Sequence, residues 1–302
     1  MDRIFDDPTT TLRLFLATIG ALIVSFFLLA AVSSALIASK VFDPAGLTQI
    51  TGSVSGRQGL RGYVLFSNLV PFTGSAMLAL WFVYRRYWTE AAGLRTAPAT
   101  GSVSYGSLFF IVGLPFVAWL AYWNLQLPLP EWMQRSEENT DLLLRGILRM
   151  ETIPEFLLAF VTIAVTPAIG EELLLRGVVQ RRIFRIWFGN AHVAIWAAAV
   201  LFSTMHLEFA GFAPRLLLGA LLGYAYYWSR SLWVPIVLHL LFNGLQVVGA
   251  YVSGEFTPEE DLTQVPPWWL GVASLGLMLY VGYLAEQKYG QEAYSGGDAG
   301  AE

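Results

Sequence analysis

Short polar stretches divide the chain into about eight apolar segments. A helix needs roughly 20 apolar residues to cross the hydrocarbon core of a bilayer, and most of these segments reach that length. We therefore predict an all-α fold, that of a polytopic membrane protein with about eight transmembrane helices. The fifth and sixth segments are short for spans. The predicted spans are about 14–39, 62–84, 105–125, 154–185, 191–208, 213–229, 232–253 and 266–286.

The composition supports this interpretation. Of the 302 residues, 56% are hydrophobic and only 13% are charged, whereas soluble domains usually carry about 25% charged residues. The net charge of −4 gives no reason to expect nucleic acid as a partner. The sequence contains no cysteine, which excludes disulfides, thiol catalysis and cysteine-ligated zinc.

An even number of spans puts both termini on the same side of the membrane. Placing them in the cytoplasm leaves eleven Lys and Arg residues inside and seven outside, in agreement with the positive-inside rule. The cluster of Arg181, Arg182 and Arg185 contributes most to this preference. We expect a multi-pass protein of the cell membrane with cytoplasmic termini.

Three other segments carry weaker signals. The link at 126–153 has helical apolar spacing together with Arg145 and Arg149, which favours an amphipathic helix at the membrane interface. Gly219 and Gly223 form a small-xxx-small motif that permits close helix packing. The tail Tyr294–Glu302 is rich in Gly, Ala and acidic residues and is predicted to be disordered.

Chemically informative residues begin in the fourth span, where an uncharged run leads directly into Glu171 and Glu172. A carboxylate inside a membrane costs about 2.5–3.5 kcal/mol on insertion scales, so such residues are usually functional. Glu172 and Arg176 are i,i+4 on a helix and can pair, whereas Glu171 has no basic residue at i+3 or i+4. Pro167 removes a backbone N–H and leaves the carbonyl of Ile163 without its helical donor. Alternatively, the two glutamates simply mark a helix end at the headgroups.

Two histidines and an amide lie in later spans. His206 ends the fifth span, and His239 and Asn243 share one face of the seventh. Glu171 and His206 stand roughly 21–22 Å from the turn near 186–190 if each residue rises about 1.5 Å, so they are expected at matching depth. A packing role for either histidine alone remains an alternative. We expect these polar groups to line a cavity bounded by spans four to seven.

An unpaired carboxylate beside a neutral imidazole in a pocket of low dielectric constant can act as a general base toward water. A second imidazole and an amide can donate hydrogen bonds to a developing oxyanion. Neither Gly-x-Ser-x-Gly nor His-Glu-x-x-His occurs in the sequence. Three alternatives stay open: a zinc site made of Glu171, His206 and His239, a non-catalytic scaffold or immunity protein, and a proton-coupled transporter.

The ordered motifs resemble those of the CPBP/Abi membrane proteases, the family of the type II CAAX prenyl endopeptidase. That family is marked by Glu-Glu-x-x-x-Arg, Phe-x-x-x-His and His-x-x-x-Asn on successive transmembrane helices. The matching segments, all within about 154–250, are Glu171-Glu172-Leu-Leu-Leu-Arg176, Phe202-Ser-Thr-Met-His206 and His239-Leu-Leu-Phe-Asn243. Leu175 replaces the usual aromatic residue before the arginine.

The resemblance implies an intramembrane glutamic-type endopeptidase that acts on membrane-associated peptide or protein substrates. Glu171 and His206 would activate water, His239 and Asn243 would hold the oxyanion, and Glu172 and Arg176 would be a structural pair. No cofactor is expected, with zinc as the alternative. The chain would divide into helices 1–3 with the interfacial helix (1–153), a catalytic core of helices 4–7 (154–253), and helix 8 with the tail (254–302).

Overall fold

The computed structural model describes residues 7–38, 51–254 and 265–290. Within these ranges the chain forms helices and turns and no β-strand. The predicted all-α fold is therefore confirmed. The predicted disorder of residues 294–302 concerns a segment outside the described residues.

Each predicted span corresponds to one helix or to a run of consecutive helical segments. The elements in chain order are α2 (Pro8–Ala38), α4 (Val54–Asn68), η2 (Leu69–Gly74), α5 (Ser75–Tyr84), η3 (Arg85–Tyr87), α6 (Trp88–Ala91), α7 (Thr100–Leu125), α8 (Glu131–Leu148), α9 (Ile153–Phe160), η4 (Val161–Val165), α10 (Thr166–Glu172), η5 (Leu173–Phe184), α11 (Arg185–Phe188), α12 (Ala191–Met205), α13 (Phe212–Ser229), α14 (Trp233–Ser253), α15 (Trp268–Ala285) and η7 (Glu286–Gly290).

Six helices or helical runs in the described part of the chain are long and apolar enough to cross a membrane. The two predicted spans outside this set are the short ones, α12 with 15 residues and α13 with 18. At about 1.5 Å per residue α12 measures roughly 22 Å, less than the ~30 Å of a bilayer core. The chain is thus a polytopic helical membrane protein, and α12 by itself is shorter than a bilayer core.

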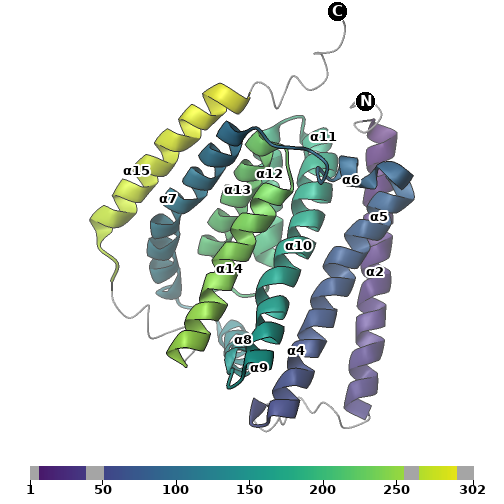
Figure 1. Ribbon diagram of the computed structural model, residues 1–302, viewed down its shortest axis with the longest axis vertical. Helices are drawn as coiled ribbons and strands as arrows, with labels where there is room; N and C mark the ends of the chain where they lie inside the picture. The colour runs from purple at the N-terminus through teal and green to yellow at the C-terminus, as the bar shows by residue number, and fades with distance from the viewer. Residues whose placement is uncertain (1–6, 39–50, 255–264, 291–302) are drawn as a thin grey trace, which may run out of the picture.

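The helices run up and down beside one another, with the α9–α11 run near the middle (Figure 1). α2 and α5 pack together on one side, and α7 and α15 pack together on the other. One apolar cluster joins α2, α5 and η5 through Leu14, Leu80 and Leu174. A second cluster, which includes Leu221 and Met278, joins α7, α13, α14 and α15. The central run therefore lies between two packed groups of helices.

The predicted close packing at Gly219 and Gly223 is confirmed. A Cβ atom at Gly219 would lie 2.9 Å from the Phe202 ring, and one at Gly223 would lie 2.9 Å from Gln180 Oε1. Because these glycines have no side chain, two α13 carbonyls are also within hydrogen-bonding distance of side chains of the central run. Arg176 Nη2 donates to Gly219 O at 2.8 Å, and Gln180 Nε2 donates to Gly223 O at 3.0 Å. Two residues spaced i,i+4 on one helix thus bind two carbonyls spaced i,i+4 on the other.

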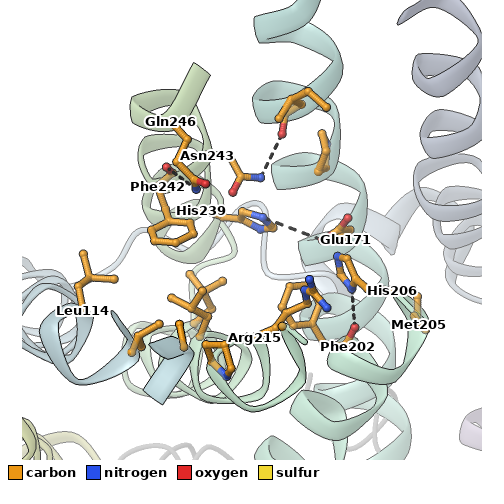
Figure 2. A pocket seen from close by; sticks show the side chains of 18 of the residues that line it. Leu114, Glu171, Phe202, Met205, His206, Arg215, His239, Phe242, Asn243 and Gln246 are labelled. Atoms are coloured by element: carbon orange, nitrogen blue, oxygen red, sulfur yellow. Dashed lines mark hydrogen bonds and ion pairs between the residues drawn. The ribbon is translucent and has the colours of Figure 1, made fainter. Parts of the chain in front are cut away.

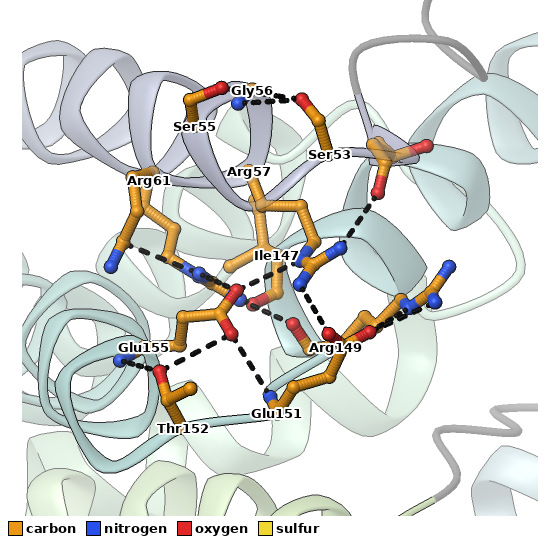
Figure 3. Close-up of polar contacts among 12 residues, drawn as sticks. Ser53, Ser55, Gly56, Arg57, Arg61, Ile147, Arg149, Glu151, Thr152 and Glu155 are labelled. Atoms are coloured by element: carbon orange, nitrogen blue, oxygen red, sulfur yellow. Dashed lines mark hydrogen bonds and ion pairs between the residues drawn. The ribbon is translucent and has the colours of Figure 1, made fainter.

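The predicted interfacial helix is α8, which leaves Trp132 and Leu142 exposed while its last residues are buried. Arg61 of α4 holds its end, and Arg57 of the same helix shares a carboxylate of α9 with Arg61 (Figure 3). Arg61 donates to Ile147 O at 2.9 Å, and Arg57 and Arg61 donate to Glu155 Oε1 at 2.8 and 3.0 Å. Arg57 and Arg61 are two of the seven basic residues that cytoplasmic termini would leave on the outer side of the membrane. In the structure both are buried and bind one buried carboxylate.

Candidate active site

A cavity of about 790 Å³ lies between η2, α7, the central run and α12–α14. Glu171, His206, His239 and Asn243, the four residues expected to be catalytic, all line it (Figure 2). Much of the remaining wall is apolar and comes from α7, α13 and α14, including Phe110, Leu114, Val117, Leu218, Leu222 and Phe242. The tertiary structure therefore brings together polar groups from three separate helices beside an apolar pocket.

Glu171 and Glu172 are adjacent in the chain but have different surroundings. Both side chains are buried, and Glu171 lines the cavity whereas Glu172 does not. Glu172 Oε1 accepts a hydrogen bond from Arg176 Nη1 at 2.9 Å, so the expected i,i+4 pair is formed. The contact of Glu171 with a titratable side chain is looser, with Oε2 lying 4.0 Å from His239 Nε2. Of the two carboxylates, Glu171 is therefore the one that faces the cavity.

Arg176 is held on three sides. Besides Glu172 it binds Gly219 O, and its guanidinium lies 5.2 Å from the centre of the Phe202 ring. Phe202 precedes His206 by one helical turn and forms an edge-to-face contact with the His206 ring, with centroids 4.9 Å apart. Arg176 therefore supports the wall that carries His206 although it does not line the cavity.

His239 bridges the two glutamates. Its Nδ1 lies 2.9 Å from Glu172 Oε1, and its Nε2 faces Glu171. An ionised carboxylate only accepts hydrogen bonds, so pairing with Glu172 places a proton on Nδ1. In the neutral ring Nε2 is then an acceptor, and it donates only when the ring is doubly protonated. The sequence analysis assigned Glu172 to Arg176 alone and missed this second contact, because the two partners are 67 residues apart.

His206 is oriented by its own helix. Its Nδ1 lies 2.8 Å from the carbonyl oxygen of Phe202, which can only accept, so Nδ1 carries the proton. The neutral ring therefore keeps Nε2 unprotonated, as a general base requires. Leu207 follows with a φ of 54°, an uncommon conformation for a residue with a side chain.

The loop after His206 is anchored by two residues that sequence analysis missed. Glu137 of α8 accepts hydrogen bonds from the backbone N–H groups of Phe209 and Ala210 at 2.6 and 3.1 Å. Asn124 of α7 donates to Phe209 O and accepts from Ala213 N, at 2.9 and 3.1 Å. Neither residue belongs to a motif, and only the fold brings them to this loop.

Asn243 has a structural contact in addition to its place in the cavity wall. Its Nδ2 donates to the carbonyl of Ile163 at 3.0 Å. This carbonyl is the one that Pro167 leaves without a helical donor. Asn243 thus satisfies a backbone acceptor at membrane depth and ties α14 to the central run. One of its two amide hydrogens is used, and the second remains for another acceptor.

Arg215 is a further member of the cavity wall that was not singled out in the sequence. Its Nη1 donates to the backbone carbonyl of Glu208 at 3.2 Å, and its Nη2 contacts the carboxylate of the same residue. Both side chains remain partly exposed, at 17% and 22%. His192, at the start of α12, is 38% exposed and places its Nδ1 3.1 Å from the hydroxyl of Tyr224, away from the cavity.

The alternative zinc site does not fit this arrangement. Throughout the described ranges, no three His, Cys, Asp or Glu side chains are grouped so that they could hold a metal ion. Metal dependence itself remains a prediction.

The region that forms the site is similar in sequence to known proteins. A family model described as type II CAAX prenyl endopeptidase Rce1-like matches residues 153–245, which include all seven motif residues. The membrane-embedded CAAX protease MroQ of Staphylococcus aureus (strain USA300) is 32% identical over 126 residues, covering 40% of this chain and 49% of that protein. Both matches support the resemblance of this region to the CPBP/Abi family.

The chain is also similar to the uncharacterized protein YpbD of Bacillus subtilis (strain 168). It is 27% identical over 105 residues, which cover 33% of this chain and 48% of that protein. The chain thus spans about half the length of the curated relatives it matches. No solved structure matches it at a significant level.

Proposed function

We propose that this protein is an intramembrane endopeptidase that hydrolyses peptide bonds of membrane-associated substrates through water activated by Glu171 and His206. The observation that supports this most directly is the convergence of Glu171, His206, His239 and Asn243 on one cavity within a helical membrane bundle. The similarity to a membrane-embedded CAAX protease favours the same class of reaction.

In the proposed reaction, Glu171 takes a proton from water and the resulting hydroxide attacks the substrate carbonyl. His206 assists through its unprotonated Nε2, since its Nδ1 is bound to Phe202 O. The oxyanion receives hydrogen bonds from the amide hydrogen of Asn243 not used by Ile163 O and from a doubly protonated His239. The proton held by Glu171 then passes to the leaving amine, which completes hydrolysis.

Glu172 acts through His239 in this scheme and touches no reacting atom. Its carboxylate binds both Arg176 and His239 Nδ1, so it fixes the ring and can stabilise the imidazolium form. Arg176 supports Glu172 and the α13 backbone. Both residues therefore have a positioning role, which extends the purely structural role that the sequence motif implied.

A non-catalytic scaffold or immunity protein is the second candidate, because the same motif residues can serve packing alone. Hydrogen bonds of Arg176, Asn243 and Gln180 to backbone carbonyls of neighbouring helices favour such a role for part of the site. A proton-coupled transporter ranks third, because such proteins usually contain an inverted repeat and the residues of the proposed site all lie in the second half of the sequence.

The test is hydrolysis by the purified protein, reconstituted in liposomes. Membranes from cells that carry Glu171→Gln would supply the uncleaved substrate. They would be incubated with purified wild type, and newly formed peptide ends would be identified by mass spectrometry. New ends produced by the wild type and absent with Glu171→Gln support an endopeptidase. Identical peptide patterns with both proteins, each shown to be folded, would favour the scaffold. The same fragments would show whether the substrate is prenylated and on which side of the membrane it is cut.

A further inference from the structure

Arg215 places a positive charge in the wall of the proposed catalytic cavity. Among the described residues that line this cavity it is the only Lys or Arg, and Glu171, His206 and His239 line the same space. Charged groups within a membrane protein are costly and tend to face a polar cavity or pathway. A cation in this position is suited to binding a negatively charged group in the cavity, which Glu171 and His206 are not proposed to do.

The guanidinium of Arg215 is held in a defined place. It lies against Gly211, where an added Cβ would come within 2.7 Å of Nη2. The loop that carries Glu208 and Gly211 is fixed by Glu137 and Asn124 through the backbone of Phe209 and Ala210. The same loop begins directly after His206. The cation is consequently fixed relative to one of the two residues proposed to activate water.

Arg215 pairs with the carboxylate of Glu208, and the arginine side of this pair faces the cavity. Glu208 does not line the cavity whereas Arg215 does, and both side chains are partly exposed. A guanidinium has five N–H donors, and Glu208 engages one on each of the two terminal nitrogens. Donors are therefore left for a second anion, or for one that displaces Glu208.

We propose that Arg215 is a specificity-determining residue that binds a carboxylate of the peptide substrate, with Glu208 as its counterion when the cavity is empty. This inference rests on the proposed function. Guanidinium and carboxylate match each other in geometry, and their hydrogen bonds are among the strong ones in proteins. The carboxylate belongs either to the C-terminus of the substrate or to an Asp or Glu side chain. Because Arg215 and Glu171 share one cavity, this group lies within a few residues of the cleaved bond.

Because Arg215 pairs with Glu208, substitutions of these two residues should change the binding of the substrate carboxylate in opposite directions. Replacing Arg215 removes the cation and weakens binding of the carboxylate. Replacing Glu208 by Gln removes the competing anion and strengthens it. A role confined to holding the loop would act differently, since both substitutions break the same loop contact and would change binding in the same direction.

Three peptides of one sequence, derived from a cleaved substrate, would serve as probes. The first has a free C-terminal carboxylate, the second has a C-terminal amide, and the third has the amide together with a Glu side chain beside the cleavage site. Binding would be measured on Glu171→Gln protein in detergent, which requires no turnover. The matched control is Arg135→Gln, because Arg135 of α8 is 77% exposed and lies outside the cavity.

We expect the Glu171→Gln protein to bind at least one carboxylate peptide about tenfold or more tightly than the amide. Arg215→Gln should abolish this selectivity, Glu208→Gln should increase it, and Arg135→Gln should leave it unchanged. The C-terminal source is identified if the first peptide is preferred, and the side-chain source if the third is preferred. In the otherwise wild-type enzyme, Arg215→Gln should raise KM for the preferred peptide more than it lowers kcat.

Equal binding of all three peptides to Glu171→Gln protein would overturn the proposal, and this comparison does not depend on the folding of any Arg215 variant. Equal weakening of acid and amide peptides by Arg215→Gln would overturn it as well. Because the probes derive from a substrate that the wild type cleaves, either of these results would overturn the Arg215 site while the proposed peptidase stands.

Discussion

Nδ1 of His239 lies 2.9 Å from Oε1 of Glu172, the same oxygen that accepts from Arg176. This contact joins α14 to the central run and fixes the proton of His239 on the nitrogen that faces away from Glu171. It makes Glu172 a positioning residue for a ring in the cavity wall, although Glu172 itself lies outside the cavity.

We expect Glu172→Gln to lower kcat by roughly 10- to 100-fold, because a charge-assisted hydrogen bond is worth about 1.5–3 kcal/mol. The pH–rate profile should also shift, since an amide stabilises the doubly protonated ring less than a carboxylate does. Glu155→Gln is the matched control: Glu155 is a buried, arginine-paired carboxylate of the same helical run outside the cavity. An unchanged kcat and pH profile in folded Glu172→Gln protein would contradict the positioning role.

Arg176→Ala and Glu171→Gln should separate folding from chemistry. Removing Arg176 leaves the buried Glu172 without its cation and Gly219 O without its side-chain donor, which should cost about 3–5 kcal/mol. Glu171→Gln keeps the side-chain size and removes only the base, so hydrolysis should be lost with little change in melting. Thermal melts in detergent would decide this. If Arg176→Ala melts at the wild-type temperature, the assignment is wrong.

The contact of Asn243 with Ile163 O predicts a non-additive pair of substitutions. Asn243→Ala should destabilise the protein by about 1–3 kcal/mol, because it leaves a buried carbonyl unsatisfied. Pro167→Ala restores the backbone N–H that can satisfy that carbonyl. Asn243→Ala should therefore cost less stability in the Pro167→Ala background. Activity should remain low in the double variant if Asn243 also holds the oxyanion, and recovery of activity together with stability would limit Asn243 to its structural contact.

The arginines of α4 should matter for stability and not for chemistry. Arg61→Ala removes donors to Glu155, Ile147 O and Arg149 O, so we expect a loss of about 3–5 kcal/mol, as for a broken buried ion pair. Arg135→Ala on exposed α8 should change stability by less than about 1 kcal/mol. The loss of stability can be measured by thermal melts, and a similar small effect of both substitutions would show that the α4–α8 contact is dispensable.

Hydrolysis should persist after exhaustive chelation. The proposed reaction uses Glu171, His206, His239 and Asn243 directly, and the two histidines are held by Glu172 and by a backbone carbonyl. The measurement is residual peptidase activity after dialysis against a chelator, with elemental analysis of the same sample. Activity that disappears on chelation and returns with one zinc per chain would reverse this prediction.

The sequence alone determined the features that depend on composition and local spacing. Long apolar runs predicted the helices, because their length against the bilayer is a property of each segment by itself. The i,i+4 spacing of Glu172 and Arg176 predicted their pair, and the spacing of Gly219 and Gly223 predicted close packing, because one helical turn brings such residues to the same face. The order of the three motifs also indicated which residues would share a cavity, although their catalytic roles remain predictions.

Only the tertiary structure decided which residues of distant helices contact each other. Glu172 meets His239 across 67 residues and Asn243 meets Ile163 across 80. Arg215 joins the cavity, while Arg57 and Arg61 turn away from solvent to bind Glu155. Sequence spacing fixes which residues share a face of one helix. It does not fix how far that helix is rotated or shifted against its neighbours, and the packing of all helices together determines which partner each buried polar group finds.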